Sequence, residues 1–307
     1  MFFIGRQAQI LKMRRILAKY KNGNYYVTLF SDGTKIKRTD DDFFVADFPD
    51  SIDLKITDYC ENACPMCHES SGASGSHGDL DDSIVDTFFR GMEVAIGGGD
   101  PLTHPNLVPF LQKLKERGVI ANVTVNVSTL KKKRDLVERL IKEELVHGVG
   151  VSCMRYDEEA VEFAKTHSNV VLHLINGVFP VDDYRRAYGK GLKILILGYK
   201  NFGRGKAYYS PEISETMRST KAALKEILDG FFVVSFDNLA LEQLNVKNAI
   251  GAKLFDEIYM GDDGDASMYV DLVKKEFALS STSVERYPLE STLEACFNRL
   301  KDHRRNH

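Results

Sequence analysis

Apolar strand patterns and helical patterns alternate along the middle of this 307-residue chain, and this alternation limits the folds it can adopt. Six stretches read as short strands, at 48–57, 93–101, 121–129, 148–154, 169–175 and 192–198. Helical patterns lie between them, at 80–91, 104–118, 133–146, 157–167 and 181–191. Consecutive units of this kind form a parallel sheet that helices cover, either closed into a barrel or left open. In both arrangements, functional residues belong at the carboxyl ends of the strands.

The segments on either side of this series predict further elements. Residues 6–20 read as a short basic amphipathic helix, and residues 24–39 read as a hairpin around a Ser-Asp-Gly turn. Beyond residue 206 the patterns predict two strands and a final helix, at 231–236, 267–277 and 289–305. We expect three units, which are an N-terminal helix and hairpin, a core, and a C-terminal extension that completes the barrel and the substrate site, at 1–50, 51–206 and 207–307.

Composition and charge exclude several classes of protein. The net charge of −3 makes no case for nucleic-acid binding, and no run of about 18 apolar residues predicts a membrane span. The apolar start, Met1–Gly5, is too short for a signal-peptide core. The five cysteines are an odd number and three of them are crowded together, which disfavours a secreted disulfide framework. We therefore expect a protein of the reducing cytoplasm.

Three of the cysteines, Cys60, Cys64 and Cys67, lie within eight residues, directly after the first strand of the series. Four thiolates complete a structural zinc or an ordinary iron–sulfur site, whereas three leave one coordination position open for chemistry. The alternative is a zinc-stabilised binding module without enzymatic activity, in which His68 or His77 is the fourth ligand. Such modules usually have paired C-x-x-C knuckles, and this chain has no second knuckle.

The C-x3-C-x2-C loop after the first strand of a repeated strand–helix chain resembles the radical S-adenosylmethionine (SAM) superfamily. The resemblance implies a partial barrel of six strand–helix units. It also implies that Cys60, Cys64 and Cys67 hold a [4Fe–4S] cluster whose open iron binds SAM. An electron from the cluster then cleaves SAM to methionine and a 5′-deoxyadenosyl radical, which takes a hydrogen atom from the substrate. An enzyme of this kind is sensitive to oxygen.

A second motif supports the resemblance, because Gly98, Gly99, Asp100 and Pro101 follow the second strand. They match the family's Gly-Gly-Glu-Pro-like motif, which holds the amino group of SAM. Glycine lets the backbone approach a ligand closely, and proline stiffens the turn. Two positions depart from the family. Asp100 is one methylene shorter than the usual glutamate, which leaves the contact to backbone carbonyls. Met66 stands where the family usually has an aromatic residue near the adenine.

Several polar or glycine-rich strand ends are further candidates for cofactor binding. Asn126 and Ser128 share one face of the third strand, which predicts either an interior pocket or a solvent-facing surface. Ser152 lies at a height where the family often contacts the ribose of SAM. Gly198 and Tyr199 begin a loop whose three basic residues suggest an anion site, or else a flexible connector: Lys200, Arg204 and Lys206.

Two residues are weaker catalytic candidates. Cys153, at the end of the fourth strand, would donate a hydrogen atom or bond a substrate radical if it faced the interior, but buried cysteine is also common packing material. Strand alternation allows only one of Ser152 and Cys153 to face inward. His173 lies between leucines on the fifth strand, where a packed histidine is the more common situation.

Together these features predict a radical SAM enzyme that acts on a small-molecule or nucleotide-like substrate and takes electrons from a flavodoxin or ferredoxin. The alternatives are an enzyme that modifies a peptide or protein and an activase that installs a glycyl radical in a partner. Only Cys153 and Cys296 remain outside the loop, too few for an additional cluster of the usual kind. Substrate selection is expected in the two segments outside the core, 1–50 and 207–307.

Overall fold

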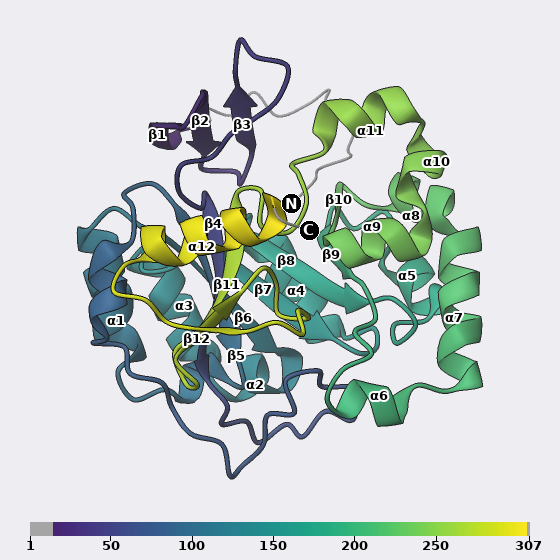
Figure 1. Cartoon of the computed structure of the whole chain (residues 1–307). Helices are drawn as coiled ribbons and strands as arrows, with labels where there is room; N and C mark the ends of the chain where they lie inside the picture. The colour runs from purple at the N-terminus through teal and green to yellow at the C-terminus, as the bar shows by residue number, and fades with distance from the viewer. Residues whose placement is uncertain (1–14, 306–307) are drawn as a thin grey trace.

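A ten-stranded sheet forms the centre of the computed structural model, which describes residues 15–305 (Figure 1). Its strand order is β10-β9-β8-β7-β6-β5-β4-β11-β12-β13. The parallel strands follow one another along the chain: β4 (Ser51–Thr57), β5 (Glu93–Gly98), β6 (Ile120–Asn126), β7 (Gly148–Cys153), β8 (Val170–Ile175), β9 (Lys193–Leu197) and β10 (Val233–Phe236). On the other side of β4, β11 (Ser267–Asp271) is also parallel, whereas β12 (Glu276–Ala278) and β13 (Tyr287–Pro288) are antiparallel.

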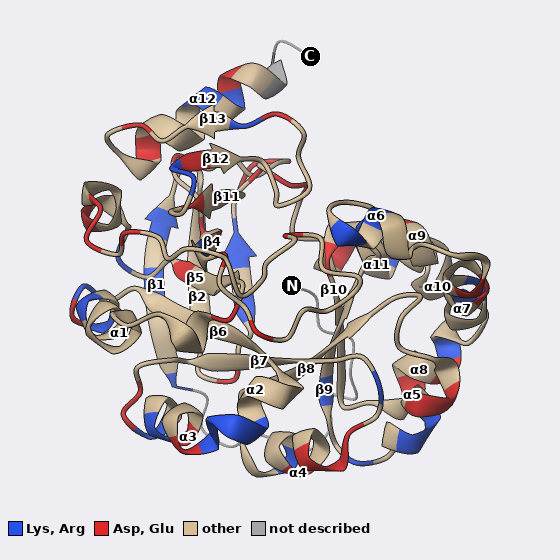
Figure 2. Cartoon of the chain, turned by 90° about the horizontal axis from the view of Figure 1, so that it is seen from below, with Lys and Arg blue, Asp and Glu red and all other residues tan. Residues whose placement is uncertain are grey.

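The sheet curves, and helices cover its outer side (Figure 2). The helices between the strands are α1 (Leu107–Glu116), α2 (Val127–Lys132), α3 (Arg134–Lys142), α4 (Glu158–Thr166), α5 (Val181–Ala187), α6 (Arg204–Tyr208), α7 (Pro211–Ala222) and α8 (Leu224–Gly230). After β10 come α9 (Asn238–Leu244), α10 (Val246–Ile250), α11 (Ala252–Ile258) and the last helix, α12 (Leu293–Arg305). Two short 3-10 turns are η1 (Ser83–Thr87) and η2 (Pro101–Thr103). In α1 the apolar side chains recur at helical spacing and are buried: Leu107, Phe110, Leu111 and Leu114.

The two faces of the parallel strands differ in chemistry. Side chains on the outer face are apolar and buried beneath the helices, as Ile52, Leu54 and Ile56 of β4 show. The inner face carries small and polar residues instead, such as Lys55 and Thr57 of β4 and Asn126 of β6. Period-two alternation along each strand separates the two sets. The core therefore lies between the sheet and its helices, while the concave side is polar.

Residues 16–38 form a separate three-stranded sheet, β1 (Ile16–Asn22), β2 (Tyr25–Phe30) and β3 (Lys35–Arg38), and residues 39–50 lead from it to β4. The predicted hairpin is confirmed as the antiparallel pair β2–β3. The predicted helix at 6–20 is wrong where the structure describes it, because 16–20 pair with β2 as a strand. Residues 6–14 lie outside the described residues.

The small sheet lies at the amino ends of the barrel strands. Lys35 of β3 pairs with Glu93 at the start of β5, with 2.5 Å between the charged atoms. Asn169, just before β8, donates a hydrogen bond to the Ser31 carbonyl at 3.1 Å. The carboxyl ends of the strands, where the cysteine loop begins, lie at the opposite end of the sheet (Figure 1).

Three other local predictions differ from the structure. Residues 80–91 hold only the turn η1 where a helix was predicted. The pattern at 267–277 is two strands, because the chain reverses at Lys275, whose φ is +55°. β6 ends at Asn126, whose side chain caps α2, so Ser128 lies in a helix and does not share the strand face.

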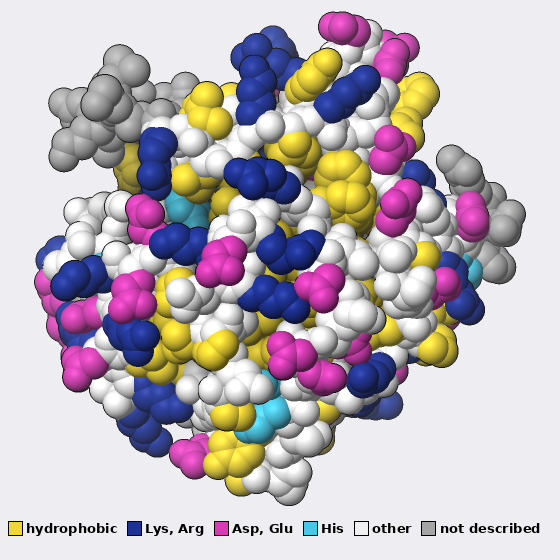
Figure 3. Space-filling view, turned by 90° about the vertical axis from the view of Figure 1, so that its left-hand side faces the viewer, with side chains coloured by type: hydrophobic (Ala, Val, Ile, Leu, Met, Phe, Trp, Pro, Cys, Tyr) yellow, Lys and Arg dark blue, Asp and Glu magenta, His cyan; other side chains and the backbone are white. Residues whose placement is uncertain are grey.

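No helix in the described part of the chain is long and apolar enough to cross a membrane. Figure 3 shows one face of the molecule, on which basic and acidic side chains are intermixed.

Candidate active site

The cysteine loop leaves β4 and folds back on itself before returning to the barrel. The backbone N–H of Cys60 donates to the Gly72 carbonyl at 3.0 Å, and that of Asp58 donates to Ser76 at 2.8 Å. Within this fold, a turn in which the N–H of Cys67 donates to the Cys64 carbonyl at 3.2 Å brings the last two cysteines together. All three cysteines of the loop are free and partly exposed.

The Gly98–Pro101 segment packs directly on the start of this loop. Gly99 donates to the Thr57 carbonyl and Asp100 to the Tyr59 carbonyl, both at 2.7 Å. A Cβ on Gly99 would lie 2.2 Å from the Tyr59 carbonyl oxygen, and one on Gly98, whose φ is +105°, would lie 2.4 Å from that of Thr57. Both positions therefore require glycine because two backbones meet there. A Cβ on Gly97, in contrast, would meet nothing within 4 Å.

The carboxylate of Asp100 accepts two hydrogen bonds from within the protein. One oxygen accepts a hydrogen bond from the Leu102 N–H at 3.1 Å and caps η2. The other accepts from the Thr129 hydroxyl, also at 3.1 Å. The Asp100 side chain is only 7 % exposed. These two bonds fix the direction of the carboxylate, which also lines the pocket beside it.

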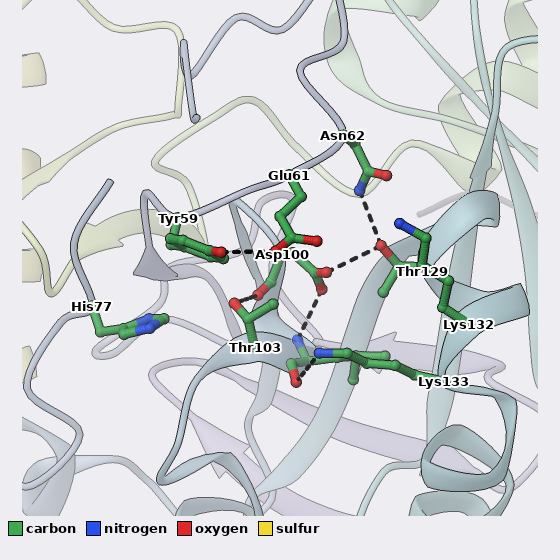
Figure 4. A pocket seen from close by; sticks show the side chains of 10 residues that line it. Tyr59, Glu61, Asn62, His77, Asp100, Thr103, Thr129, Lys132 and Lys133 are labelled. Atoms are coloured by element: carbon green, nitrogen blue, oxygen red, sulfur yellow. Dashed lines mark hydrogen bonds between the residues drawn. The ribbon is translucent and has the colours of Figure 1, made fainter. Parts of the chain in front are cut away.

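A pocket of about 360 Å³ lies beside Asp100, between the cysteine loop, η2 and α2 (Figure 4). Its wall carries both signs of charge, with Glu61 on one side and the ammonium groups of Lys132 and Lys133 on the other. The remaining lining residues are Tyr59, Asn62, His77, Asp100, Leu102, Thr103 and Thr129. A pocket of this composition suits a small zwitterion.

Polar side chains from β6 and α2 reach the cysteine loop. The amide nitrogen of Asn126 lies 3.7 Å from the Cys64 sulfur, and that of Asn62 lies 3.7 Å from the Cys60 sulfur. Ser128, although helical, still donates its hydroxyl to this group. Sequence reasoning missed Asn62 and Thr129. The only local signal for Asn62 was an amide between two cysteines.

The glycine-rich loop after β9 wraps around the cysteine loop. Arg204 donates its backbone N–H to the Cys67 carbonyl at 3.1 Å and its Nε to the Cys64 carbonyl at 3.0 Å. Of the other two basic residues expected at an anion site, Lys200 donates to the Ser281 hydroxyl at 2.8 Å and Lys206 is exposed. Arg204 and Lys200 therefore already have partners within the protein.

Gly198 and Tyr199, two other expected cofactor residues, are engaged in packing. A Cβ on Gly198 would lie 2.5 Å from Leu239, and the Tyr199 hydroxyl donates to the Gly205 carbonyl at 2.6 Å. Tyr199 and Met66 belong to a small apolar cluster with Val178 and Ile213, separate from the main core. Met66 thereby anchors the cysteine loop to the far side of the barrel.

Lys55 links the polar face of β4 to the cysteine loop. Its ammonium lies 2.6 Å from Asp58, 2.9 Å from Glu69 and 3.2 Å from Asp271, and its side chain is 2 % exposed. Burial opposes the charged form, but the carboxylates of Glu69 and Asp58 outweigh it and hold the pKa of Lys55 above its ordinary value. Sequence reasoning missed this group, because a lysine on a strand carries no local sign of its partners.

The fourth and fifth strands place their candidates on different faces. Ser152 faces the inner side, whereas Cys153 lies in the core with a pKa that burial raises to about 12. The buried position of Cys153 supports the alternative in which this thiol only packs in the core. His173 faces inward beside Gly150, where a Cβ would lie 2.2 Å from its ring. Desolvation lowers the pKa of His173 to about 4, so its imidazole is neutral at pH 7.

The residues named for a zinc site have other partners. His77 Nδ1 lies 2.9 Å from the Thr57 hydroxyl, and the His68 ring lies 3.4 Å from the Glu69 carboxylate. Among residues 15–305, no three His, Cys, Asp or Glu side chains are grouped so that they could hold one metal ion. A cubane cluster makes a different demand, because each thiolate binds its own iron.

No family model matches the sequence, and no curated protein matches it. Solved structures do match the fold. Streptococcus suis SuiB bound to its precursor peptide SuiA superposes with a TM-score of 0.57 at 14% identity, over 86% of this chain and 68% of SuiB. The chain has the SuiB fold. The predicted partial barrel with its N-terminal hairpin and C-terminal extension is therefore confirmed.

Two further SuiB structures agree. SuiB bound to S-adenosylmethionine has a TM-score of 0.54 at 13% identity, over 80% of this chain and 64% of SuiB. A third SuiB structure has a TM-score of 0.53 at 15% identity, over 86% of this chain and 69% of SuiB. This chain thus spans about two thirds of the length of SuiB.

Proposed function

We propose that this chain is a radical SAM enzyme in which Cys60, Cys64 and Cys67 ligate a [4Fe–4S] cluster. The observation that carries the proposal is the contact between the cysteine loop and Gly98–Pro101, at the carboxyl end of a partial barrel. SuiB shares this fold, and one SuiB structure is bound to S-adenosylmethionine. Both motifs of the sequence resemblance thus meet at one place.

The residues present suit such a cluster. Three free thiols lie on one partly exposed loop, and amide nitrogens face two of the sulfurs. Thiolates carry negative charge, so nearby N–H donors stabilise them. When bound, the cluster would supply the electron that cleaves SAM, and the 5′-deoxyadenosyl radical so formed would take a hydrogen atom from the substrate.

The glycine segment and its neighbours would hold the methionine end of SAM. The Asp100 carboxylate already accepts two hydrogen bonds, and the backbone of Gly97–Gly99 is proposed to receive the amino end. The adjacent pocket offers Lys132 and Lys133 to a carboxylate. Asn126 and Ser128 lie beside the cysteine loop, and Ser152 of β7 pairs with Asn126, so these three residues are proposed to contact the rest of the cofactor.

We further propose a peptide as the substrate, in place of the small molecule expected from the sequence. The support is the fold shared with SuiB, one of whose structures contains a precursor peptide. Cys153 and Cys296 are both buried and separate, so an additional cluster is not part of this proposal. A flavodoxin or ferredoxin would supply the electron, and the cytoplasm would provide the reducing surroundings.

The test is anaerobic. The protein is reconstituted with iron and sulfide, reduced with dithionite and given SAM, and 5′-deoxyadenosine is measured by mass spectrometry. Cys64→Ala should lose the cluster and the product, whereas Cys153→Ala, which removes a buried thiol outside the loop, should keep both. A wild-type protein that holds one zinc and leaves SAM intact would contradict the proposal.

A further inference from the structure

Two asparagine amides face two of the three loop sulfurs. The surrounding hydrogen bonds determine whether the nitrogen or the oxygen of each amide faces the sulfur. We propose that Asn62 and Asn126 donate N–H···S hydrogen bonds to Cys60 and Cys64 and thereby raise the reduction potential of the bound cluster. The proposal rests on the proposed function. It assigns both side chains as positioning residues that act on the cysteines.

The orientation of Asn126 follows from a backbone donor. The N–H of Ser128 donates to one end of the Asn126 amide at 2.9 Å, so this end is the oxygen. The Ser128 hydroxyl lies 2.9 Å from the same oxygen. The other end, which is 3.7 Å from the Cys64 sulfur, must then be the NH₂ group. The amide cannot turn over without placing two donors against each other.

The orientation of the Asn62 amide follows from the Asp100 carboxylate, which is connected to it through the Thr129 hydroxyl. A carboxylate accepts hydrogen bonds only, so the single hydroxyl proton of Thr129 is donated to Asp100 at 3.1 Å. The Thr129 oxygen must then accept from Asn62, at 3.0 Å, and the amide end that faces it is the NH₂ group. The same nitrogen lies 3.7 Å from the Cys60 sulfur and has a second hydrogen for it.

In this orientation the amide oxygen of Asn62 faces the Ser128 hydroxyl, which lies between the two amides. The single hydroxyl proton is shared between the amide oxygens of Asn62 and Asn126. One serine therefore connects both asparagines, and Asp100 connects the group to the glycine motif through Thr129. Asp100 is buried, whereas both amides are partly exposed and border the cysteine loop.

Hydrogen bonds to ligand sulfurs stabilise the more electron-rich state of an iron–sulfur cluster, which raises its potential. The arrangement also provides a use for aspartate at position 100. Its shorter side chain ends on Thr129 and the Leu102 N–H, where it fixes the direction of the Asn62 amide. Asp100 would act on the cluster through this chain of contacts.

The experiment is an EPR-monitored redox titration of the reconstituted protein. Asn62→Leu and Asn126→Leu keep about the same side-chain size but remove the donor. Each should shift the midpoint potential to a more negative value, and the double variant should shift it further. Asn122→Leu is the matched control, because Asn122 lies on the same face of β6 and makes no hydrogen bond to a sulfur within the described residues. It should keep the wild-type potential.

A second measurement does not depend on the variants taking up a cluster. Wild-type protein carrying asparagine labelled with ¹⁵N only in the side-chain amide should show ¹⁵N couplings to the reduced cluster by ENDOR. Absence of these couplings, or wild-type potentials in both leucine variants, would overturn the inference while SAM cleavage continues. A wild-type protein that binds no [4Fe–4S] cluster would instead overturn the proposed function, and this inference with it.

Discussion

Arg204 donates a hydrogen bond from its Nε to the carbonyl oxygen of Cys64, at 3.0 Å, across 140 positions of the chain. Its backbone N–H also donates to Cys67 at 3.1 Å. The loop after the last core strand thus holds the cysteine loop after the first one. The two ends of the strand series are joined at the candidate active site.

Arg204→Ala is expected to loosen the cysteine loop. Hydrogen bonds from a charged donor contribute roughly 1.5–3 kcal/mol, so the free energy of unfolding should fall by about that amount. Hydrogen–deuterium exchange should rise in residues 60–70. Lys206→Ala, an exposed position two residues away, is the control and should change neither quantity. Equal exchange in both variants would show that Arg204 does not restrain the loop.

Alanine at Gly99 and at Gly97 should have different effects. Gly99→Ala places a methyl group 2.2 Å from the Tyr59 carbonyl, and such overpacking costs about 1–3 kcal/mol. Gly97→Ala meets open space and should unfold at the wild-type urea concentration. Under the proposed function, Gly97→Ala should still weaken SAM binding, as measured by calorimetry on the reconstituted protein. A Gly99→Ala protein as stable as wild type would disprove the close backbone contact.

Lys55→Met removes the cation from three carboxylates. Breaking a buried ionic group costs about 3–5 kcal/mol, so a large loss of stability is expected at pH 7. Lys274→Met, at an exposed lysine, is the control and should stay within about 0.5 kcal/mol of wild type.

The loss of stability in Lys55→Met should depend on pH. Burial favours the protonated, neutral form of the Glu69 carboxyl. The interactions with His68 and Lys55 outweigh this effect of burial and hold the pKa of Glu69 well below its ordinary value of 4.5. The stabilisation is therefore present above pH 4.5 and is lost as the pH falls below it. Urea unfolding should show a smaller difference between wild type and Lys55→Met at pH 4 than at pH 7. A difference that is independent of pH would mean that the carboxylates are not coupled to Lys55.

Asp50→Ala should destabilise the small N-terminal sheet without altering the active site. Asp50 is buried, pairs with Lys37 at 2.7 Å and accepts from Tyr25 at 2.8 Å, so its removal should cost about 3–5 kcal/mol. Because this sheet lies at the amino ends of the strands, SAM cleavage per folded molecule should be unchanged at low temperature. Asp47→Ala, at an exposed position, is the control. Loss of cleavage in the folded Asp50→Ala protein would place residues 15–50 in the site after all.

Much of the barrel could be predicted because its signals are local. Period-two alternation in β4, such as Ile52, Leu54 and Ile56, marks a strand with one buried face wherever that strand later lies. Helix signals failed where capping decided the boundary. The pattern predicts a strand through Ser128, but the Asn126 side chain accepts the Ser128 N–H and begins α2 at Val127, six residues before the predicted helix at 133–146.

The chemistry available to this protein can be read from local sequence: three thiols follow one strand and a glycine motif follows the next. The partners that surround these groups depend on the fold. Lys55 meets Asp271 because β11, although distant in the chain, pairs with β4 and places Asp271 opposite Lys55. Arg204 meets Cys64 because the sheet curves until the loop after β9 approaches the cysteine loop (Figure 2). Periodicity and spacing act over a few residues, whereas these contacts depend on which strands pair and on how the whole sheet bends.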